Sequence, residues 1–282
     1  MAAPPAAIEK RLSDRPDAGT DAVVFENVFL AFDEKIVLDG ISFRLAKGET
    51  KAIFGVAGSG KSTILKLALG LMKPDSGRIH VLGEDVTCMR ENELFELRRK
   101  IGMVFQESAL FDSLTVRENV AYRLLEEGNV AESEVEAPVH EALSFVELEN
   151  AVDKFPAELS GGMRRRVAIA RAIITRPEVL FYDSPTGGLD PVTSTTIIQL
   201  IVKQRDVYKT SSLLVTHRLQ DAFIMATHYF DRKANEMRPL PLGARGEVPM
   251  AFLLLRDGKI IFDGDAREFA ESRDEYIREY IS

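Results

Sequence analysis

The chain has 282 residues, 45% of them hydrophobic and 28% charged, enough to bury one large core or two small ones. Its formal net charge of −8 disfavours non-specific electrostatic binding to nucleic acid, so we expect no nucleic-acid partner. Apolar runs such as 251–255 fall far short of the roughly 20 residues that cross a bilayer, and the single cysteine, Cys88, excludes an internal disulfide and suits a reducing compartment. Any membrane association is expected to come through a partner.

The first 20 residues are rich in Ala and Pro and show no periodic apolar pattern, which predicts a flexible N-terminal tail. The fold is expected to begin near Asp21. Short apolar runs between Gly, Asp and Lys turns predict strands. They lie at 22–25, 41–43, 51–54, 79–82, 179–182 and 212–215. Because the last two are continuously apolar, as in strands covered on both faces, we predict an α/β fold with a parallel sheet and flanking helices.

Helical patterns occupy the middle of the chain. They cover 91–100, 115–127 and a segment opened by Pro138 that carries Val139, Leu143 and Val146 on one face. We interpret about 91–175 as a helical subdomain inserted into a domain that spans 21–264.

Two segments near the end of the chain carry separate predictions. Residues 233–249, rich in Pro, Arg and Gly, predict an extra loop. Residues 265–282 predict a C-terminal helix whose apolar stripe is formed by Phe269, Tyr276, Ile277 and Tyr280. We expect the stripe to pack on its own domain, with exchange between subunits as the alternative.

The segment from Gly55 to Thr63 fits the phosphate-loop pattern G-x-x-x-x-G-K-[ST] between a predicted strand and a predicted helix. Glycines let backbone N–H groups close around phosphates, Lys61 adds a full positive charge, and Ser62 offers a hydroxyl to Mg²⁺. A glycine-rich turn that binds nothing is the alternative, and the order of strand, loop and helix disfavours it. The candidate nucleotide-binding residues here are Gly55, Val56, Ala57, Gly58, Ser59, Gly60, Lys61, Ser62 and Thr63.

A second glycine-bearing segment, Leu-Ser-Gly-Gly-Met at 159–163, follows the phosphate loop and precedes the strand that ends at Asp183. Ser160 is suited to cap the following helix, and the N–H groups of Gly161 and Gly162 can approach a phosphate closely. With 165–171, this order of motifs resembles the ATP-binding subunits of ABC transporters. A Ser-Gly-Gly helix start without a ligand is the alternative.

The resemblance covers about 21–264 and implies a P-loop NTPase (ABC ATPase) core that uses ATP and Mg²⁺. In that family ATP is sandwiched between the phosphate loop of one subunit and the 160–162 segment of another. The resemblance therefore implies a second ATPase subunit as partner, in a homodimer or a heterodimer.

The resemblance also implies roles for four single residues. Gln106 matches the glutamine that contacts Mg²⁺ and links nucleotide occupancy to the membrane subunit, and Asp190 matches the loop that crosses the dimer interface. His217 matches the family's switch histidine, and Phe32 occupies the position of the aromatic that stacks on adenine. The alternatives are a surface glutamine, an ordinary helix cap, a structural histidine and a core phenylalanine.

Asp183 matches the carboxylate that holds Mg²⁺ through water, but Ser184 stands where the family normally carries a glutamate that helps water attack ATP. A hydroxyl cannot accept a proton at neutral pH as a carboxylate can, and losing a general base costs about 10²–10⁴ in rate. The expected catalytic residues are Lys61, Gln106, Asp183, Ser184 and His217, and the expected metal ligands are Ser62, Gln106 and Asp183.

Three interpretations of Ser184 remain open. The subunit is a slow ATPase in which Gln106, His217 and Ser184 position water; or it is the degenerate half of a heterodimer whose other half has the glutamate; or it is a non-hydrolytic, ATP-gated regulatory module.

Within the family, the segments 105–116 and 118–122, together with Met163, look most like the ATPases of Mla- and Mce-type bacterial lipid transporters. This resemblance implies a multispanning permease as partner, an MCE-domain lipid-binding protein as a further partner, and a cytoplasmic location at the inner face of the cell membrane. Leu110 and Phe111 predict an apolar patch for the permease, with burial in the helical subdomain as the alternative.

Overall fold

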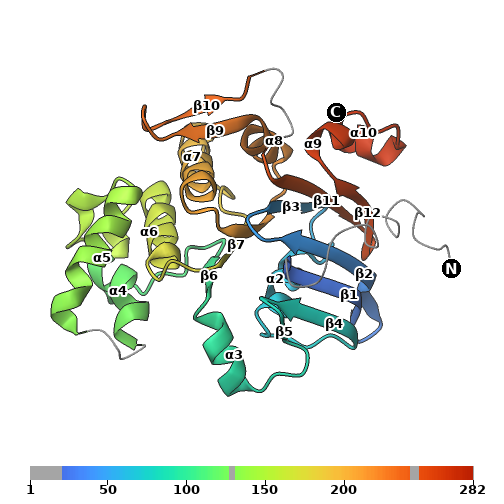
Figure 1. Ribbon diagram of the computed structural model, residues 1–282, viewed down its shortest axis with the longest axis horizontal. Coiled ribbons are helices and arrows are strands. Elements are labelled where there is room, and N and C mark those ends of the chain that lie inside the picture. The colour runs from blue at the N-terminus through green and yellow to red at the C-terminus, as the bar shows by residue number, and fades with distance from the viewer. Residues whose placement is uncertain (1–20, 127–130, 242–247, 282) are drawn as a thin grey trace.

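Strands form where the sequence carries its short apolar runs, and the chain folds as an α/β structure (Figure 1). The computed structural model describes residues 21–126, 131–241 and 248–281, so the predicted N-terminal tail lies outside the described residues. The strands are β1 (Asp21–Phe32), β2 (Lys35–Ala46), β3 (Thr50–Gly55), β4 (Ser76–Val81), β5 (Glu84–Asp85), β6 (Ile101–Val104), β7 (Val179–Asp183), β8 (Ser211–Val215), β9 (His228–Asp231), β10 (Glu236–Pro239), β11 (Met250–Arg256) and β12 (Lys259–Gly264). The helices are α2 (Lys61–Ala68), α3 (Glu91–Arg98), α4 (Val116–Glu126), α5 (Glu132–Phe145), α6 (Gly161–Ile173), α7 (Pro191–Tyr208), α8 (Leu219–Thr227), α9 (Ala266–Ala270) and α10 (Glu275–Ile281), with 3-10 turns η2 (Glu149–Ala151) and η3 (Pro156–Glu158).

The parallel sheet that the sequence predicts is confirmed. In the described part of the chain its strands have the order β12-β11-β3-β8-β7-β6, and all run parallel except β12 at one edge. We call this the core sheet. Its register pairs Gly55 with Leu255 and Asp183 with Val215, so β3, β7, β8 and β11 end at a common edge. In open α/β sheets ligands bind at the carboxyl ends of the strands, which is this edge.

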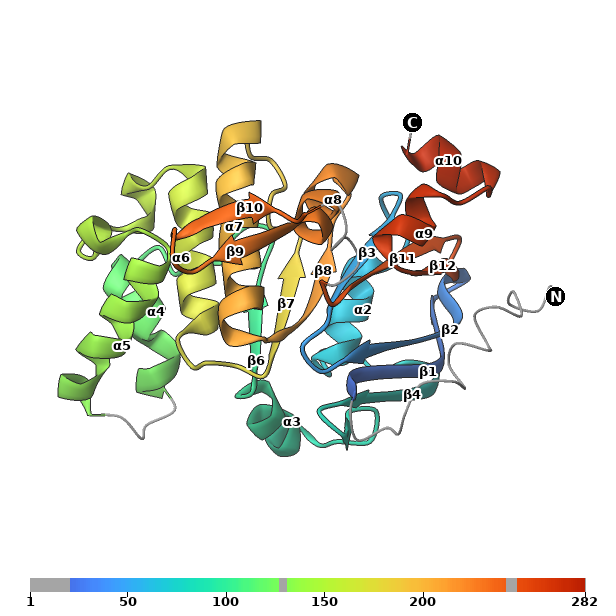
Figure 2. The same cartoon turned by 45° about the horizontal axis from the view of Figure 1, so that its top comes forward.

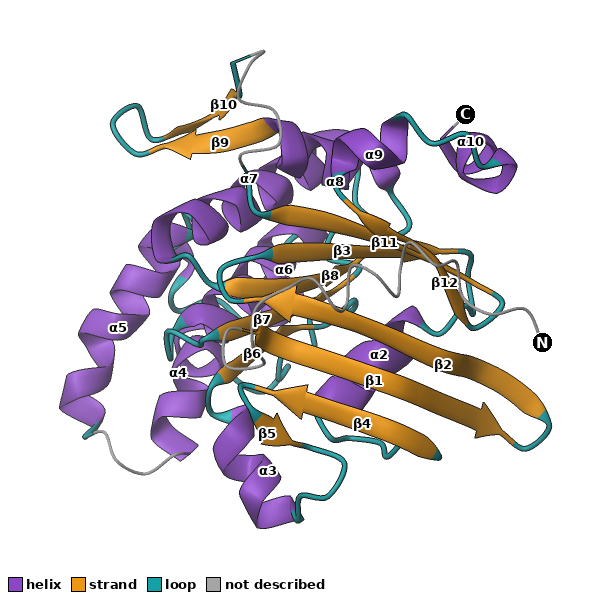
Figure 3. Cartoon of the chain, turned by 45° about the vertical axis from the view of Figure 1, so that its right-hand side comes forward, coloured by secondary structure: helices purple, strands orange, loops and turns teal. Residues whose placement is uncertain are grey.

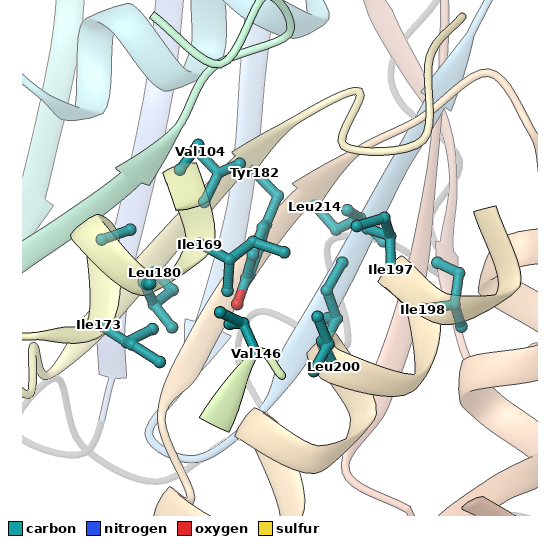
Figure 4. Close-up of a cluster of buried hydrophobic side chains, with 14 of the residues drawn as sticks. Val104, Val146, Ile169, Ile173, Leu180, Tyr182, Ile197, Ile198, Leu200 and Leu214 are labelled. Carbon is teal, nitrogen blue, oxygen red and sulfur yellow. The ribbon is translucent and has the colours of Figure 1, made fainter. Parts of the chain in front are cut away.

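A second, antiparallel sheet with the order β2-β1-β4-β5 lies beside the core sheet, and helix α2 packs between the two (Figures 2 and 3). Successive residues of a strand point to opposite faces, and both faces of the core sheet are buried. Ile53 and Phe181 face α2 and the second sheet, whereas Phe54, Leu180 and Tyr182 face the remaining helices. Figure 4 shows Leu180 and Tyr182 enclosed by apolar side chains of α6 and α7.

The helical region departs from prediction in two places. The range predicted for the inserted subdomain, about 91–175, includes β6, which pairs with β7 in the core sheet, and α3, which packs with the core around α2. Helices α4, α5 and α6 pack on one another and form the green and yellow group in Figure 1. The prediction that Pro138 opens a helix is wrong, because α5 begins at Glu132 and holds Pro138 in its interior.

The segments near the end of the chain also differ from prediction. Part of the predicted loop at 233–249 is regular, because β10 pairs with β9 in an antiparallel hairpin; residues 242–247 lie outside the described residues. The single C-terminal helix predicted at 265–282 is two short helices, α9 and α10. Their apolar side chains, Phe269 and Ile277 above all, are buried against their own chain, which confirms that part of the prediction.

Candidate active site

The phosphate loop connects the end of β3 to the start of α2 at the carboxyl edge of the core sheet. Two of its glycines are required by geometry. A Cβ on Gly55 would lie 2.6 Å from the Leu255 carbonyl oxygen, and Gly60, with φ of 95°, would place a Cβ 2.9 Å from Leu38. Gly60 is also the N-cap of α2 and has no side chain with which to cap it, so the first N–H groups of the helix are left for a ligand such as phosphate.

Lys61 holds its positive charge inside this loop. Its Nζ donates to the carbonyl oxygens of Gly55 at 2.9 Å and Val56 at 2.7 Å, and to Ser59 Oγ at 3.3 Å. Burial lowers the pKa of Lys61, and the negative charge of Asp183 acts in the opposite direction. A cation fixed among backbone dipoles at a helix N-terminus is suited to an anionic ligand.

Ser62 and Asp183 come together although they lie far apart in the sequence. The Ser62 hydroxyl donates to Asp183 Oδ1 at 3.1 Å, which links the start of α2 to the end of β7. Within the described residues no group of three or more His, Cys, Asp or Glu side chains could enclose a metal ion. One hydroxyl and one carboxylate do fit Mg²⁺, which usually keeps several waters and takes its other ligands from substrate phosphates.

Ser184 is set in an unusual backbone conformation. Its φ is +46°, in the left-handed region, and its N–H donates to the Val215 carbonyl at 2.9 Å, which ties the end of β7 to β8. The residue is only 8% exposed, and its hydroxyl lies 3.4 Å from Asp183 Oδ1. The residue that departs from the family pattern therefore lies directly beside the predicted metal ligand.

Gln106 follows β6 and is exposed, and it lies close to Ser184 across Gly187. A Cβ on Gly187 would be 3.5 Å from Ser184 Cβ and 3.9 Å from Gln106 Cγ. The structure therefore brings together the predicted catalytic residues from the ends of β6 and β7.

His217 and Phe32 are both exposed. His217 is exposed and lies two residues beyond Val215, the residue at the end of β8 that Ser184 contacts. Phe32 ends β1 and is 48% exposed, so the alternative of a core phenylalanine does not hold. The role of each toward a nucleotide remains a prediction.

The glycine-bearing segment at 160–162 forms a separate group with Asp190. Ser160 caps α6 by accepting from the Met163 N–H at 3.2 Å, and Asp190 caps α7 by accepting from the Thr193 N–H at 3.0 Å. A Cβ on Gly162 would lie 2.4 Å from Thr193 Cγ2, so the starts of α6 and α7 are in close contact. Within the described residues no hydrogen bond or ion pair joins this group to the phosphate loop.

Two arginines of α6 position the loop after β6, and sequence reasoning assigned them no role. The buried Arg165 donates to the carbonyl oxygens of Phe105 at 2.6 Å and Gly187 at 3.4 Å. Arg171 donates to those of Ser108 at 2.8 Å and Ala109 at 2.7 Å. Both arginines belong to the 165–171 segment that resembles the family, which was the only sequence signal for them, and the contacts that they make are seen only in the fold.

The predicted apolar patch is divided by the structure. Leu110 packs against the core, whereas Phe111 is 42% exposed and its ring packs at a tilt of 40° on Tyr122, with ring centroids 4.5 Å apart. The buried Asn119 fixes this loop, because its Oδ1 accepts from the Phe111 N–H at 2.8 Å and its Nδ2 donates to the carbonyl oxygens of Phe111 and Leu114, both at 3.0 Å. Phe111 is therefore presented on an ordered loop.

Known proteins resemble this chain in sequence and in fold. The family model described as "ABC transporter" matches residues 38–187, which include the phosphate loop, Gln106 and Asp183. The protein TRIGALACTOSYLDIACYLGLYCEROL 3 of Arabidopsis thaliana is 37% identical over 265 residues, which cover 91% of this chain and 72% of that protein. The intermembrane phospholipid transport system ATP-binding protein MlaF of Haemophilus influenzae is 29% identical over 256 residues, which cover 91% of this chain and 88% of that protein.

A methionine import ATP-binding protein MetN of Bacillus thuringiensis is 41% identical over a shorter stretch, 182 residues, which is 64% of this chain and 53% of that protein. Among solved structures, a dimeric ATP-binding cassette in a post-hydrolysis state with ADP and Pi superposes with a TM-score of 0.71 at 29% identity, over 86% of this chain and 98% of that one.

Among the residues that the structure describes, no helix combines the length and the apolar character needed to cross a membrane. One family is indicated by the segment that the family model matches, by the share of this chain that the relatives cover and by the superposition on a solved ATP-binding cassette. The chain is an ATP-binding subunit of the ABC transporter family, and its cassette is that of an ATPase.

Proposed function

We propose that two copies of this chain, or this chain and a related subunit, close on ATP and power a transporter of phospholipid or another lipid. The observation that carries the dimer is the division of the predicted site into two groups. Lys61, Ser62 and Asp183 form one group, the 160–162 segment with Asp190 forms the other, and in the described part of the chain no hydrogen bond or ion pair joins the two. A two-fold dimer places each group of one subunit against the complementary group of the other.

In the closed dimer the chain's own residues bind and orient the nucleotide. The N–H groups at the start of α2 and the charge of Lys61 hold the phosphates, while Ser62 and Asp183 hold Mg²⁺, which neutralises charge on the phosphate oxygens when bound. The N–H groups of Gly161 and Gly162 from the partner subunit approach the terminal phosphate. Phe32, exposed at the end of β1, stacks on the adenine.

Ser184 makes hydrolysis slow in this proposal. Its hydroxyl lies beside Asp183 and cannot act as a general base at neutral pH, so the role of Gln106, Ser184 and His217 is to orient the attacking water. The degenerate half of a heterodimer and the non-hydrolytic module are the competing interpretations, and substitution of Ser184 by Glu separates both of them from the slow ATPase.

The share of this chain that each relative covers supports a lipid as the transported substrate. The two relatives matched over 91% of this chain are named for trigalactosyldiacylglycerol, a glycolipid, and for intermembrane phospholipid transport. The methionine importer is matched over 64%. We therefore propose a multispanning permease and an MCE-domain lipid-binding protein as partners, with this subunit on the cytosolic side of the membrane.

The test is to purify the complex from its native membrane and to measure its ATPase activity in lipid nanodiscs. We expect phospholipid to co-purify and the rate to respond to the nanodisc phospholipid. As the matched control, the same complex is assayed with methionine. A rate that responds to methionine but not to lipid would assign the subunit to amino-acid import instead.

A further inference from the structure

The two C-terminal helices contact the end of β3, where the phosphate loop begins. Helices this short do not form alone, so their position is set by packing. Phe269 of α9 and Ile277 of α10 are buried against the chain. In Figure 2 both helices lie beside the upper ends of β3 and β11, the edge from which the phosphate loop leaves the core sheet.

Two adjacent residues of β3 receive these contacts. The Phe269 ring stacks on Phe54 with centroids 6.0 Å apart, and the Tyr280 hydroxyl oxygen accepts from the Gly55 N–H at 3.3 Å. On the same face of α10, one turn earlier, the Arg256 guanidinium lies 4.2 Å from the centroid of the Tyr276 ring. Helix α10 is thereby held against the ends of both β3 and β11.

Gly55 connects Tyr280 to the charged residue of the loop. Its N–H donates to Tyr280, and its carbonyl oxygen accepts from Lys61 Nζ at 2.9 Å. Gly55 is buried, and a buried N–H without a hydrogen-bond partner is destabilising. Burial also raises the pKa of Tyr280, so the hydroxyl stays neutral at physiological pH. The C-terminal helix therefore holds in place the Gly55 peptide backbone, to whose carbonyl oxygen Lys61 donates.

We propose that Tyr280 is a positioning residue for the phosphate loop, through which the C-terminal helix sets the affinity for ATP. This proposal rests on the proposed function of the loop. A loop that is already ordered loses less conformational freedom when it binds phosphate, and the hydrogen bond to Tyr280 supplies part of that order. Tyr280 contacts no reacting atom, so it is expected to change the binding of ATP and not the chemical step.

The experiment compares Tyr280→Phe with Tyr276→Phe in the full chain. Each removes one hydroxyl from α10, but only the first removes the acceptor of the Gly55 N–H, and the second keeps an aromatic ring beside Arg256. We expect Tyr280→Phe to raise the Kd for Mg-ATP by about three- to tenfold, the worth of one hydrogen bond. The KM for ATP should rise in parallel while kcat stays within about twofold, and Tyr276→Phe should stay within about twofold in all three quantities.

Hydrogen exchange of a peptide covering residues 50–60 gives a second readout that does not depend on turnover. Exchange should become faster in Tyr280→Phe and stay unchanged in Tyr276→Phe. Equal affinity in Tyr280→Phe and the unmodified chain, or equal loss in both variants, would overturn the proposal. Lys61→Ala is measured alongside. If it binds ATP as well as the unmodified chain, the phosphate-loop assignment itself is wrong and this proposal fails with it.

Discussion

The Ser62 hydroxyl lies 3.1 Å from Asp183 Oδ1, although 121 residues separate the two in the chain. The pair joins the first turn of α2 to the end of β7 and places a hydroxyl and a carboxylate where a phosphate-bound Mg²⁺ is expected. Lys61 precedes Ser62 and Ser184 follows Asp183, so the charge of the loop and the departure from the family pattern are both fixed around this pair.

Lys61→Ala is expected to weaken Mg-ATP binding by about tenfold or more, because the loop loses the charged donor that its carbonyl groups hold in place. Lys66→Ala is the matched control, since it removes an exposed lysine from the same helix. Direct titration with nucleotide measures both. An unchanged affinity of Lys61→Ala for Mg-ATP would contradict the phosphate-loop assignment.

Ser184→Glu is expected to raise steady-state ATP hydrolysis by about one to three orders of magnitude, because it restores a carboxylate next to Asp183. The gain is limited by space, since residue 184 is 8% exposed and has a positive φ. Ser184→Ala controls for the hydroxyl, and adding Lys61→Ala to each form excludes contaminating ATPases.

The outcomes of this substitution separate the slow ATPase from the other two interpretations of Ser184. Slow hydrolysis that Glu accelerates supports a slow ATPase. Fast hydrolysis by the unmodified chain would show that another residue activates water. No hydrolysis in either form would favour the regulatory module or a heterodimer whose other subunit is absent from the assay.

Gly161→Asp is expected to leave ATP binding by the monomer nearly unchanged while it blocks ATP-induced dimerisation, because a carboxylate would face the terminal phosphate across the interface. A Cβ at Gly161 would meet its nearest neighbour, Leu189 Cδ2, at an ordinary 3.6 Å. Gly162 is the poorer choice, since a Cβ there would lie 2.4 Å from Thr193 Cγ2 and would disturb the contact of α6 with α7.

Sedimentation velocity with Mg-ATP measures the dimer, and Gly161→Ala is the control for backbone and volume. Normal dimerisation of the aspartate variant would contradict the proposed ATP sandwich.

Phe111→Asp is expected to uncouple the subunit from its permease without unfolding it, because the ring is exposed on a loop that Asn119 and Arg171 hold in place. Leu125→Asp is the matched control: its side chain is 40% exposed against 42% for Phe111, and it lies on α4. Co-purification with the permease and thermal unfolding are measured for both. Retained co-purification of Phe111→Asp with the permease would remove the support for this contact.

The sequence alone was enough to predict the parallel sheet and the phosphate loop, because both are recorded in local patterns. The apolar runs at 179–182 and 212–215 form strands that are buried on both faces, and the glycines at 55 and 60 have φ values of 146° and 95°, which the backbone of the loop itself requires. The same locality explains the failures. Pro138 is typical of a helix start, yet α5 begins at Glu132, and the Pro-, Arg- and Gly-rich 233–249 stretch still pairs a strand with β9.

The tertiary structure alone decided which distant residues meet. Arg165 reaches the carbonyl oxygens of Phe105 and Gly187 only because β6 and β7 are neighbours in the core sheet, and Tyr280 reaches Gly55 across 225 residues. No periodicity or spacing encodes such a pair, since the contact depends on how whole elements pack and not on the residues beside each partner. The sequence determines the chemistry that each motif can offer, and the packing determines which groups support it.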